Sequence, residues 1–185
     1  MPVQPQRGFT LVELVITLLI AAILVTVGIP SYRYIIRDNR GTAIANEALT
    51  AINFARSEAI KRGISVSVRS STGTTDWSQG YSVFVDINGD GTFTDDGDAD
   101  TCETDATTKL PTEDCLLRVW DRHKGKVNTV TAGASSLTYN SAGSTTPFTI
   151  NRIWPYGECE KDRQQEWTVT VTAVGRASVS KSNCT

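Results

Sequence analysis

A short polar segment leads straight into a long apolar one at the start of this chain. Residues 1–8 contain Arg7 and end at Gly8, and residues 9–29 are apolar apart from Glu13, three threonines and one glycine. An apolar stretch of roughly 20 residues is long enough for a helix to cross a bilayer. A carboxylate in hydrocarbon costs about 2.5 kcal/mol or more, so such residues are rare and functional. Glu13 is therefore predicted to be a functional residue with a positively charged partner.

The order of these segments differs from that of an ordinary secretory signal. In such a signal the apolar stretch comes first and a small-residue cleavage site follows it. Here the small residue Gly8 precedes the apolar stretch. Cleavage after Gly8 would leave the apolar segment on the mature chain, with Phe9 as its first residue.

The string from Gly8 to Glu13, Gly-Phe-Thr-Leu-Val-Glu, resembles the type III signal of type IV pilins and of type II secretion pseudopilins. The resemblance implies that a prepilin peptidase cuts between Gly8 and Phe9 and methylates the Phe9 amine. It also implies that Glu13 pairs with the positively charged N-terminus of a neighbouring subunit. That pairing would set the axial register of each subunit in a filament. A plain membrane anchor would explain neither the acid nor the leader.

Helical periodicity continues beyond the apolar segment. Pro30 is predicted to kink the helix, because proline removes a backbone donor and clashes with the preceding turn. Gly63 is the predicted C-cap. Between them, apolar residues recur three and four positions apart: Ala45, Ala48, Leu49, Ile52, Ala55 and Ala59.

After Gly63 the period changes from 3.6 to 2, which indicates strands. The segments with this pattern are 66–68, 81–85, 116–120, 137–139, 167–173 and 177–180, with Gly175 as the turn between the last two. A helix followed by antiparallel strands predicts an α+β fold. The predicted organisation is a leader over 1–8, a membrane-spanning and polymerising helix over 9–30, an amphipathic second half over 31–63 and a β-rich head over 64–185.

The order of three head segments is similar to that of the GspH/FimT-like pilins: residues 81–91, 137–143 and 174–176. This resemblance implies a pilin-like fold, in which a long kinked helix packs on an antiparallel sheet. It implies a subunit held in the bacterial inner membrane, with its head in the periplasm and with other major and minor pilins or pseudopilins as partners. The family contains minor pilins of type IV pili and the H pseudopilin of type II secretion.

The four cysteines of an exported chain predict two disulfides, for which three connectivities exist. We favour the pairing of sequence neighbours, Cys102–Cys115 and Cys159–Cys184. The second pair would clamp the C-terminal region of the head. The first would close an acidic insertion, because ten of the twenty Asp and Glu residues lie between Asp86 and Asp114.

The segment that starts at Asp86 has two interpretations. Asp86, Asn88 and Asp90, followed by Gly91, match the first half of a calcium-binding loop. The twelfth position, where that loop needs a bidentate glutamate, is Gly97. The same residues form two turn-forming pairs after a strand. A β-turn is the favoured interpretation, and calcium is the alternative.

Basic residues near the C-terminus raise the question of DNA binding. Some members of the family bind DNA through a Gly-Arg-x-Arg element in this region. Here the matching stretch contains Arg176 but has Ser178 in place of the second arginine, and Lys181 follows. Phosphate contacts need clustered positive charge. A solvated surface of mixed charge is favoured over a nucleic-acid site that uses Arg176 and Lys181.

No nucleophile motif or phosphate-binding loop accompanies the single histidine, His123. The sequence therefore predicts no catalysis and no need for a cofactor. The favoured function is a structural minor pilin of a type IV pilus that acts in filament assembly near the tip. The alternatives are an H-type pseudopilin of type II secretion and a DNA-binding minor pilin for natural transformation.

Overall fold

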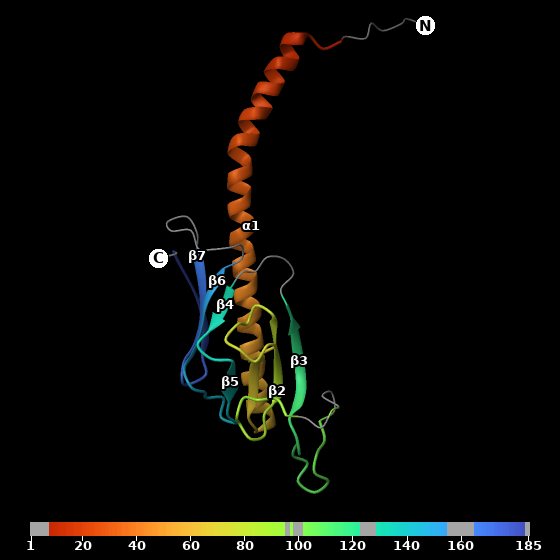
Figure 1. Ribbon diagram of the computed structural model, residues 1–185, viewed down its shortest axis with the longest axis vertical. Helices are drawn as coiled ribbons and strands as arrows, with labels where there is room; N and C mark the ends of the chain where they lie inside the picture. The colour runs from red at the N-terminus through yellow and green to blue at the C-terminus, as the bar shows by residue number, and fades with distance from the viewer. Residues whose placement is uncertain (1–7, 95–96, 98–101, 123–128, 155–164, 184–185) are drawn as a thin grey trace, which may run out of the picture. The chain divides into compact units, whose positions relative to one another are not determined.

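The computed structural model describes residues 8–94, 97, 102–122, 129–154 and 165–183 (Figure 1). The chain divides into two compact units, Met1–Asp38 and Asn39–Thr185. One long helix, α1 (Leu11–Arg62), contributes to both units, and every strand belongs to the second.

Helix α1 contains 52 residues and continues through Pro30 without a break. The proline therefore does not end the helix, and the kink expected at this residue stays a prediction. The helix ends as the sequence indicates. Gly63 has a φ of 71°, and its N–H donates to the Ala59 carbonyl at 2.9 Å. A residue with positive φ at this position is a common helix C-cap, and glycine adopts it without a Cβ penalty.

The strands of the second unit form two four-stranded antiparallel sheets. The first sheet has the order β3 (Cys115–Asp121), β2 (Gly80–Val85), β1 (Val66–Ser70), β5 (Ser136–Tyr139). The second has the order β4 (Thr129–Ala132), β6 (Phe148–Trp154), β7 (Gln165–Val171), β8 (Ala177–Asn183). Figure 1 shows these strands gathered around the C-terminal part of α1. The α+β class and the antiparallel head are confirmed.

Two strands, β4 and β6, have no clear signal in the sequence. Their mutual pairing shifts register between Thr129 and Thr131. The pairing of β6 with β7 shifts between Ile150 and Ile153. At both shifts the extra residue lies on β6, so the alternation of apolar and polar side chains is interrupted in that strand. Strand β4 has only four residues, the minimum for an alternating pattern. The β7–β8 hairpin, which the sequence does predict, pairs without interruption from Gln165↔Asn183 to Val171↔Ala177.

The core of the second unit lies between α1 and both sheets. The helix contributes mostly small side chains, all at most 4% exposed: Ile44, Ala45, Ala48, Ala51, Ile52, Ala55 and Ala59. Large rings fill the space opposite them. The ring centre of Trp77 lies 5.3 Å from that of Phe148 and 5.7 Å from that of Tyr81. The Tyr81 ring stacks on Trp120 with 5.8 Å between the ring centres. Alanines on the helix and aromatic rings on the sheets give complementary packing without long helical side chains.

Gly41 lies against Trp167 in the second sheet. A methyl group built on its Cα would overlap the six-membered ring of Trp167. Trp167 is only 3% exposed, so its ring has little room to move. The glycine is therefore required by packing, although Gly41 has no positive φ that would demand it.

Gly41→Ala is expected to destabilise the head by about 1–3 kcal/mol, because added core volume displaces packed side chains. In an ordinary helix interior the same change stabilises by about 1 kcal/mol. Thr42→Ala is the matched control, since Thr42 is the next residue and is exposed. Thermal unfolding of the two variants measures the difference. A Gly41→Ala variant as stable as the unsubstituted protein would contradict the contact with Trp167.

Candidate functional site

Thr10 is the N-cap of helix α1. Its Oγ1 accepts the Glu13 N–H at 3.2 Å, and its carbonyl accepts the Leu14 N–H at 3.2 Å. Thr10 and Glu13 have the spacing of a capping box. Glu13 is the acid of the first turn, where the positive end of the helix dipole favours a negative charge. The residue predicted to be functional thus also suits the start of the helix.

The peptide bond between Gly8 and Phe9 precedes the helix. Residues 8–10 have no regular secondary structure, and the Phe9 side chain is 82% exposed. Backbone outside a helix is free of intrahelical hydrogen bonds, which is the state a peptidase needs. Cleavage at Gly8–Phe9 and methylation of Phe9 stay predictions.

Apolar side chains of the first unit are exposed. From Phe9 to Ile29, the described large apolar residues other than Val27 are 49–82% exposed. Glu13 is exposed among them and makes no ion pair with any residue that the structure describes. The hydroxyls of Thr17 and Thr26 donate to the carbonyls of Leu14 and Ile23 at 2.9 and 2.8 Å. The polar groups of these two threonines are therefore satisfied within the helix, as an apolar environment requires.

Among the residues that the structure describes, no helix has an apolar stretch sufficient to count as a candidate membrane span.

The Asp86 side chain organises the loop that follows β2. Its carboxylate accepts the N–H groups of Gly89 at 2.7 Å and Gly91 at 2.9 Å, as well as the hydroxyl of Ser67. Asp86 is fully buried. Asn88 and Asp90 lie on the exposed side of the loop, where the Asn88 amide donates to Asp90 at 3.0 Å. Both Asp86 oxygens are thus occupied by protein donors, as the turn interpretation expects.

No group of three metal-ligating His, Cys, Asp or Glu side chains is found within the described residues. Calcium is therefore expected to leave the thermal unfolding midpoint of the protein unchanged, because Asp86 already satisfies its charge with backbone donors. The measurement compares melting curves in millimolar calcium and in chelator. A higher unfolding midpoint in calcium, reversed by chelator, would support a calcium site at Asp86, Asn88 and Asp90.

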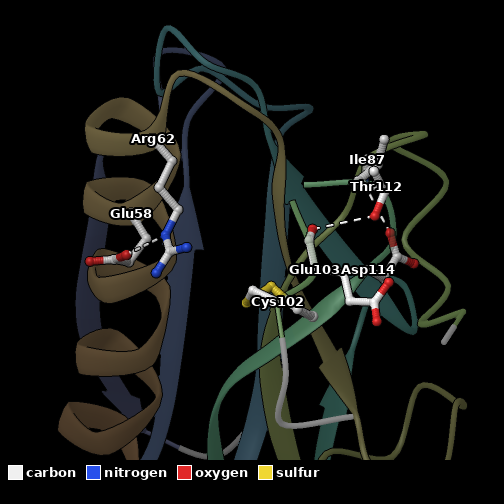
Figure 2. The surroundings of a disulfide bond; sticks show 8 residues. Glu58, Arg62, Ile87, Cys102, Glu103, Thr112 and Asp114 are labelled. Atoms are coloured by element: carbon white, nitrogen blue, oxygen red, sulfur yellow. Dashed lines mark hydrogen bonds and ion pairs between the residues drawn. A yellow bond between two sulfur atoms is a disulfide. The ribbon is translucent and has the colours of Figure 1, made fainter. Parts of the chain in front are cut away.

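The predicted disulfide Cys102–Cys115 is present. It closes the base of an arm formed by residues 102–115. The Thr112 N–H donates to the Glu103 carbonyl at 3.0 Å just beyond the disulfide. Figure 2 shows Thr112 and Glu103 beside Cys102, joined by the Thr112 hydroxyl, which donates to the same carbonyl at 3.4 Å, and it shows Asp114 directed at Ile87. The second predicted pair, Cys159–Cys184, lies outside the described residues.

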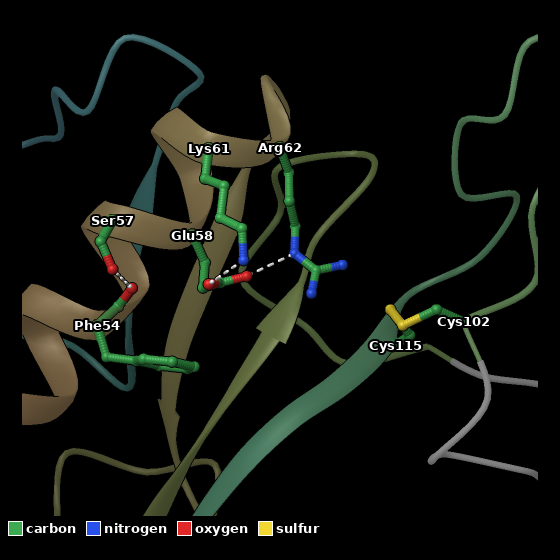
Figure 3. A network of polar contacts seen from close by, with 7 residues as sticks. All are labelled: Phe54, Ser57, Glu58, Lys61, Arg62, Cys102 and Cys115. Atoms are coloured by element: carbon green, nitrogen blue, oxygen red, sulfur yellow. Dashed lines mark hydrogen bonds and ion pairs between the residues drawn. A yellow bond between two sulfur atoms is a disulfide. The ribbon is translucent and has the colours of Figure 1, made fainter.

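The C-terminal end of α1 has a small ion-pair network. Arg62 donates to Glu58 at 2.7 Å, and Lys61 lies 3.5 Å from the other carboxylate oxygen (Figure 3). The hydrogen bond from Arg62 lowers the pKa of the Glu58 carboxyl. Pairs of this spacing on a helix surface contribute only a few tenths of a kcal/mol to helix stability. Lys61, with its side chain 74% exposed, is available for contacts outside the head.

Arg56 connects α1 to two turns that are far apart in sequence. Its Nε donates to the Gly143 carbonyl at 3.0 Å, and its Nη2 donates to the Val174 carbonyl at 2.9 Å. Tyr139 lies in the same cluster, where its hydroxyl donates to the Gly175 carbonyl at 3.4 Å. Burial raises the pKa of Tyr139 to about 12, and the charge of Arg56 opposes that shift. The sequence gives no indication of this connection, because its partners are backbone carbonyls.

Arg176 and Lys181 do not lie together. Arg176 is exposed in the turn before β8, and Lys181 is exposed within that strand. Five residues separate them, so their Cα atoms lie about 16 Å apart at the rise of an extended chain. The Lys181 ammonium lies 5.3 Å from the centre of the Trp167 ring. His123 and the nearby basic residues Lys124 and Lys126 lie outside the described residues.

Two family models match this chain, one over the head and one over the N-terminal segment. The model of the family described as type II transport protein GspH matches residues 45–175. The chain belongs to this GspH family. The prokaryotic N-terminal methylation motif matches residues 4–29, which include Gly8, Phe9 and Glu13. The GspH-family chain is thus a pilin-like protein, a minor pilin or a pseudopilin, of a class that assembles with other pilin-like subunits.

The fold is similar to that of a solved minor pilin. Two crystal forms of the type IV minor pilin FimU from Pseudomonas aeruginosa match at TM-scores of 0.54 and 0.52, each with 18% sequence identity. The matches cover 77% and 75% of the GspH-family chain and 90% and 91% of FimU. At this identity the similarity concerns the fold, and it confirms the pilin-like architecture expected from the sequence.

Proposed function

We propose that this GspH-family protein is a minor pilin of a type IV pilus. It is processed by a prepilin peptidase between Gly8 and Phe9 and anchored in the inner membrane by residues 9–30, with its head in the periplasm. It is then incorporated near the tip of the filament, next to other pilin subunits.

The observation that carries this proposal is the state of the first unit. An N-capped helix presents exposed apolar side chains on every turn, with one acid, Glu13, in its first turn. Exposed apolar surface of this extent is unfavourable in water and marks a membrane or protein interaction site. In a filament, neighbouring helices would cover this surface, and the free amine of a cleaved Phe9 would supply the charge that Glu13 needs.

The choice of a pilus over a type II secretion system rests on the acidic insertion with its own disulfide, a surface that a tip subunit can present outside the cell. Deletion of the gene in the source bacterium tests this choice. Loss of surface pili with normal protein secretion supports the minor pilin. Loss of secretion with normal piliation supports the H-type pseudopilin instead.

DNA binding by this subunit is not favoured, because Arg176 and Lys181 lie apart along β8 and no second arginine follows Arg176. A gel-shift experiment with the purified protein at low salt is expected to show no complex. A shift that disappears in Arg176→Gln and weakens with salt would support a role in natural transformation.

The proposal requires neither catalysis nor a bound cofactor. Mass spectrometry of the mature protein tests the processing step directly. The expected N-terminal residue is an N-methylated Phe9, and a chain that still begins at Met1 would contradict assembly through the Glu13–amine pair.

A further inference from the structure

The second sheet ends in a strand with which only one described strand pairs. Strand β8 comes last in the order of this sheet, and it pairs with β7. Figure 1 shows it in dark blue beside β7. The side of β8 that faces away from β7 is here called the open edge. A strand at such an edge presents a row of backbone N–H and C=O groups to which another chain can pair.

The turn between β7 and β8 determines which backbone groups face the open edge. The Thr172 N–H donates to the Arg176 carbonyl at 3.0 Å, so these residues form a hydrogen-bonded pair. Hydrogen-bonded and non-bonded pairs alternate along an antiparallel ladder. The register runs without interruption from Val171↔Ala177 to Gln165↔Asn183. The N–H and C=O groups that point away from β7 are therefore those of Ala177, Val179, Lys181 and Asn183.

The other edges of the two sheets have features that oppose pairing with another chain. The segment 75–77 lies along the outer side of β4, where the Trp77 N–H donates to the Val130 carbonyl at 2.8 Å. Strand β3 contains a bulge and carries the exposed charges of Arg118 and Asp121. Strand β5 has only four residues. Coverage by a loop, bulges, charged side chains and short strands are the usual protection of sheet edges.

Strand β8 has little of this protection. It contains seven residues, pairs with β7 without a register shift and includes no proline. Its one charged residue, Lys181, is third from the C-terminal end of the strand, and its ammonium lies 5.3 Å from the centre of the Trp167 ring. The other side chains of the strand are uncharged, and most are small. Another backbone can therefore approach β8 closely.

The charge of this region favours an acidic partner. From Thr172 to Asn183 the chain has two charged residues, Arg176 and Lys181, and both are positive. Both side chains are exposed. A second copy of β8 would bring the same positive charges to the edge, and like charges on adjacent strands are destabilising. A strand with Asp or Glu side chains has the complementary charge.

We propose that the open edge of β8 accepts an extended, acidic segment of a neighbouring pilin subunit as a further strand of the second sheet. Main-chain hydrogen bonds give the affinity of such an added strand, and side chains give its specificity. Ala177 and Val179 pack against the core of the head, so the added strand places small or apolar side chains beside them. The inference rests on the proposed function, because it requires a filament in which the protein has neighbours.

Val179→Pro tests the backbone contact. Proline removes an N–H that faces the open edge and no hydrogen bond to β7, and edge strands accept proline at such positions. Val179→Ala is the matched control, because it shortens the same side chain and keeps the N–H. Incorporation into sheared filaments is expected to be about 10-fold lower for the proline variant than for the alanine variant, since a main-chain hydrogen bond is lost. Thermal unfolding of the two full-length variants in detergent micelles is expected to give similar midpoints.

Equal incorporation of the two variants would overturn the strand addition. It would leave the minor-pilin function intact, since the gene deletion tests that function separately.

A photo-cross-linking residue, p-benzoylphenylalanine, in place of Ser180 tests the same edge without a change to the backbone. Ser180 is exposed in the middle of β8. The expected product in sheared filaments is an adduct with another pilin subunit, at a peptide that contains Asp or Glu and is identified by mass spectrometry. This experiment decides the question if Val179→Pro unfolds the head. An adduct with a second copy of this chain or with a protein that is not a pilin, or the absence of any adduct, would contradict the proposal.

Discussion

Replacing Glu13 by glutamine is expected to reduce incorporation of the protein into filaments by on the order of 100-fold or more, with the protein still present in the membrane fraction. Glutamine keeps the length of the side chain and the helical N3 position after the Thr10 cap. It removes the negative charge that would pair with the amine of a neighbouring subunit. Breaking one side of a buried ion pair costs about 3–5 kcal/mol, because the other charge is left without compensation.

Immunodetection of the protein in sheared filaments and in membranes measures this effect. Thr17→Val is the matched control, because it changes a residue in the same apolar segment whose hydroxyl bonds only to its own helix. The control is expected to assemble normally. Equal incorporation of Glu13→Gln and the unsubstituted protein would remove the assigned role of Glu13 and leave the apolar helix as a simple anchor.

Gly175→Ala is expected to have the largest effect on the stability of the head, about 3 kcal/mol or more. Gly175 has a φ of 78°, which costs a residue with a Cβ about 1–2 kcal/mol. A methyl group at this position would also overlap the carbonyl oxygen of Gly143 and come within 2.9 Å of Arg56 Nε and 3.0 Å of the Tyr139 ring. The substitution therefore forces apart the two turns that Arg56 holds together.

Gly63→Ala is the control that isolates the backbone term. Gly63 has nearly the same φ, 71°, but nothing lies within 4 Å of an added Cβ. The Gly63→Ala variant is expected to lose only the backbone term, about 1–2 kcal/mol. In a domain of this size, a loss of 1 kcal/mol lowers the melting temperature by roughly 2–4 °C. Thermal unfolding can therefore distinguish the losses in Gly175→Ala and Gly63→Ala. Equal losses in both would show that the turn at Gly175 can relax away from Gly143.

The parts of the fold that the sequence predicts are those with local causes. Helix α1 follows from the apolar segment and the alanine stripe, and its end follows from Gly63. The β7–β8 hairpin follows from unbroken alternation and the turn at Gly175. At the N-terminus, the cleavage motif and the acid stand within six residues, so sequence spacing alone identifies them, and the methylation-motif match covers the same residues.

The parts that the sequence does not predict depend on contacts between distant residues. Two bulges hide β6, because each puts an extra residue on that strand and interrupts the alternation on which the prediction depends. Strand β4 has only four residues, which is the minimum for an alternating pattern. Asp86 resembles a calcium ligand in the sequence, and only the structure shows its donors from Ser67, Gly89 and Gly91. Asp114 has no motif at all, because its partners are backbone N–H groups about twenty or more residues away.

Gly41 and Arg56 attach α1 to the rest of the head at two separate positions along the helix. They stand 15 residues apart, which is about 22 Å along a helix. At Gly41 the Trp167 ring packs against the helix backbone. At Arg56 the guanidinium donates hydrogen bonds to two backbone carbonyls. With two such contacts, α1 can neither translate along its axis nor rotate about it relative to the sheets. If tension acted on α1 in a filament, both contacts would therefore carry the load, and the sheets would not separate from the helix starting at one end.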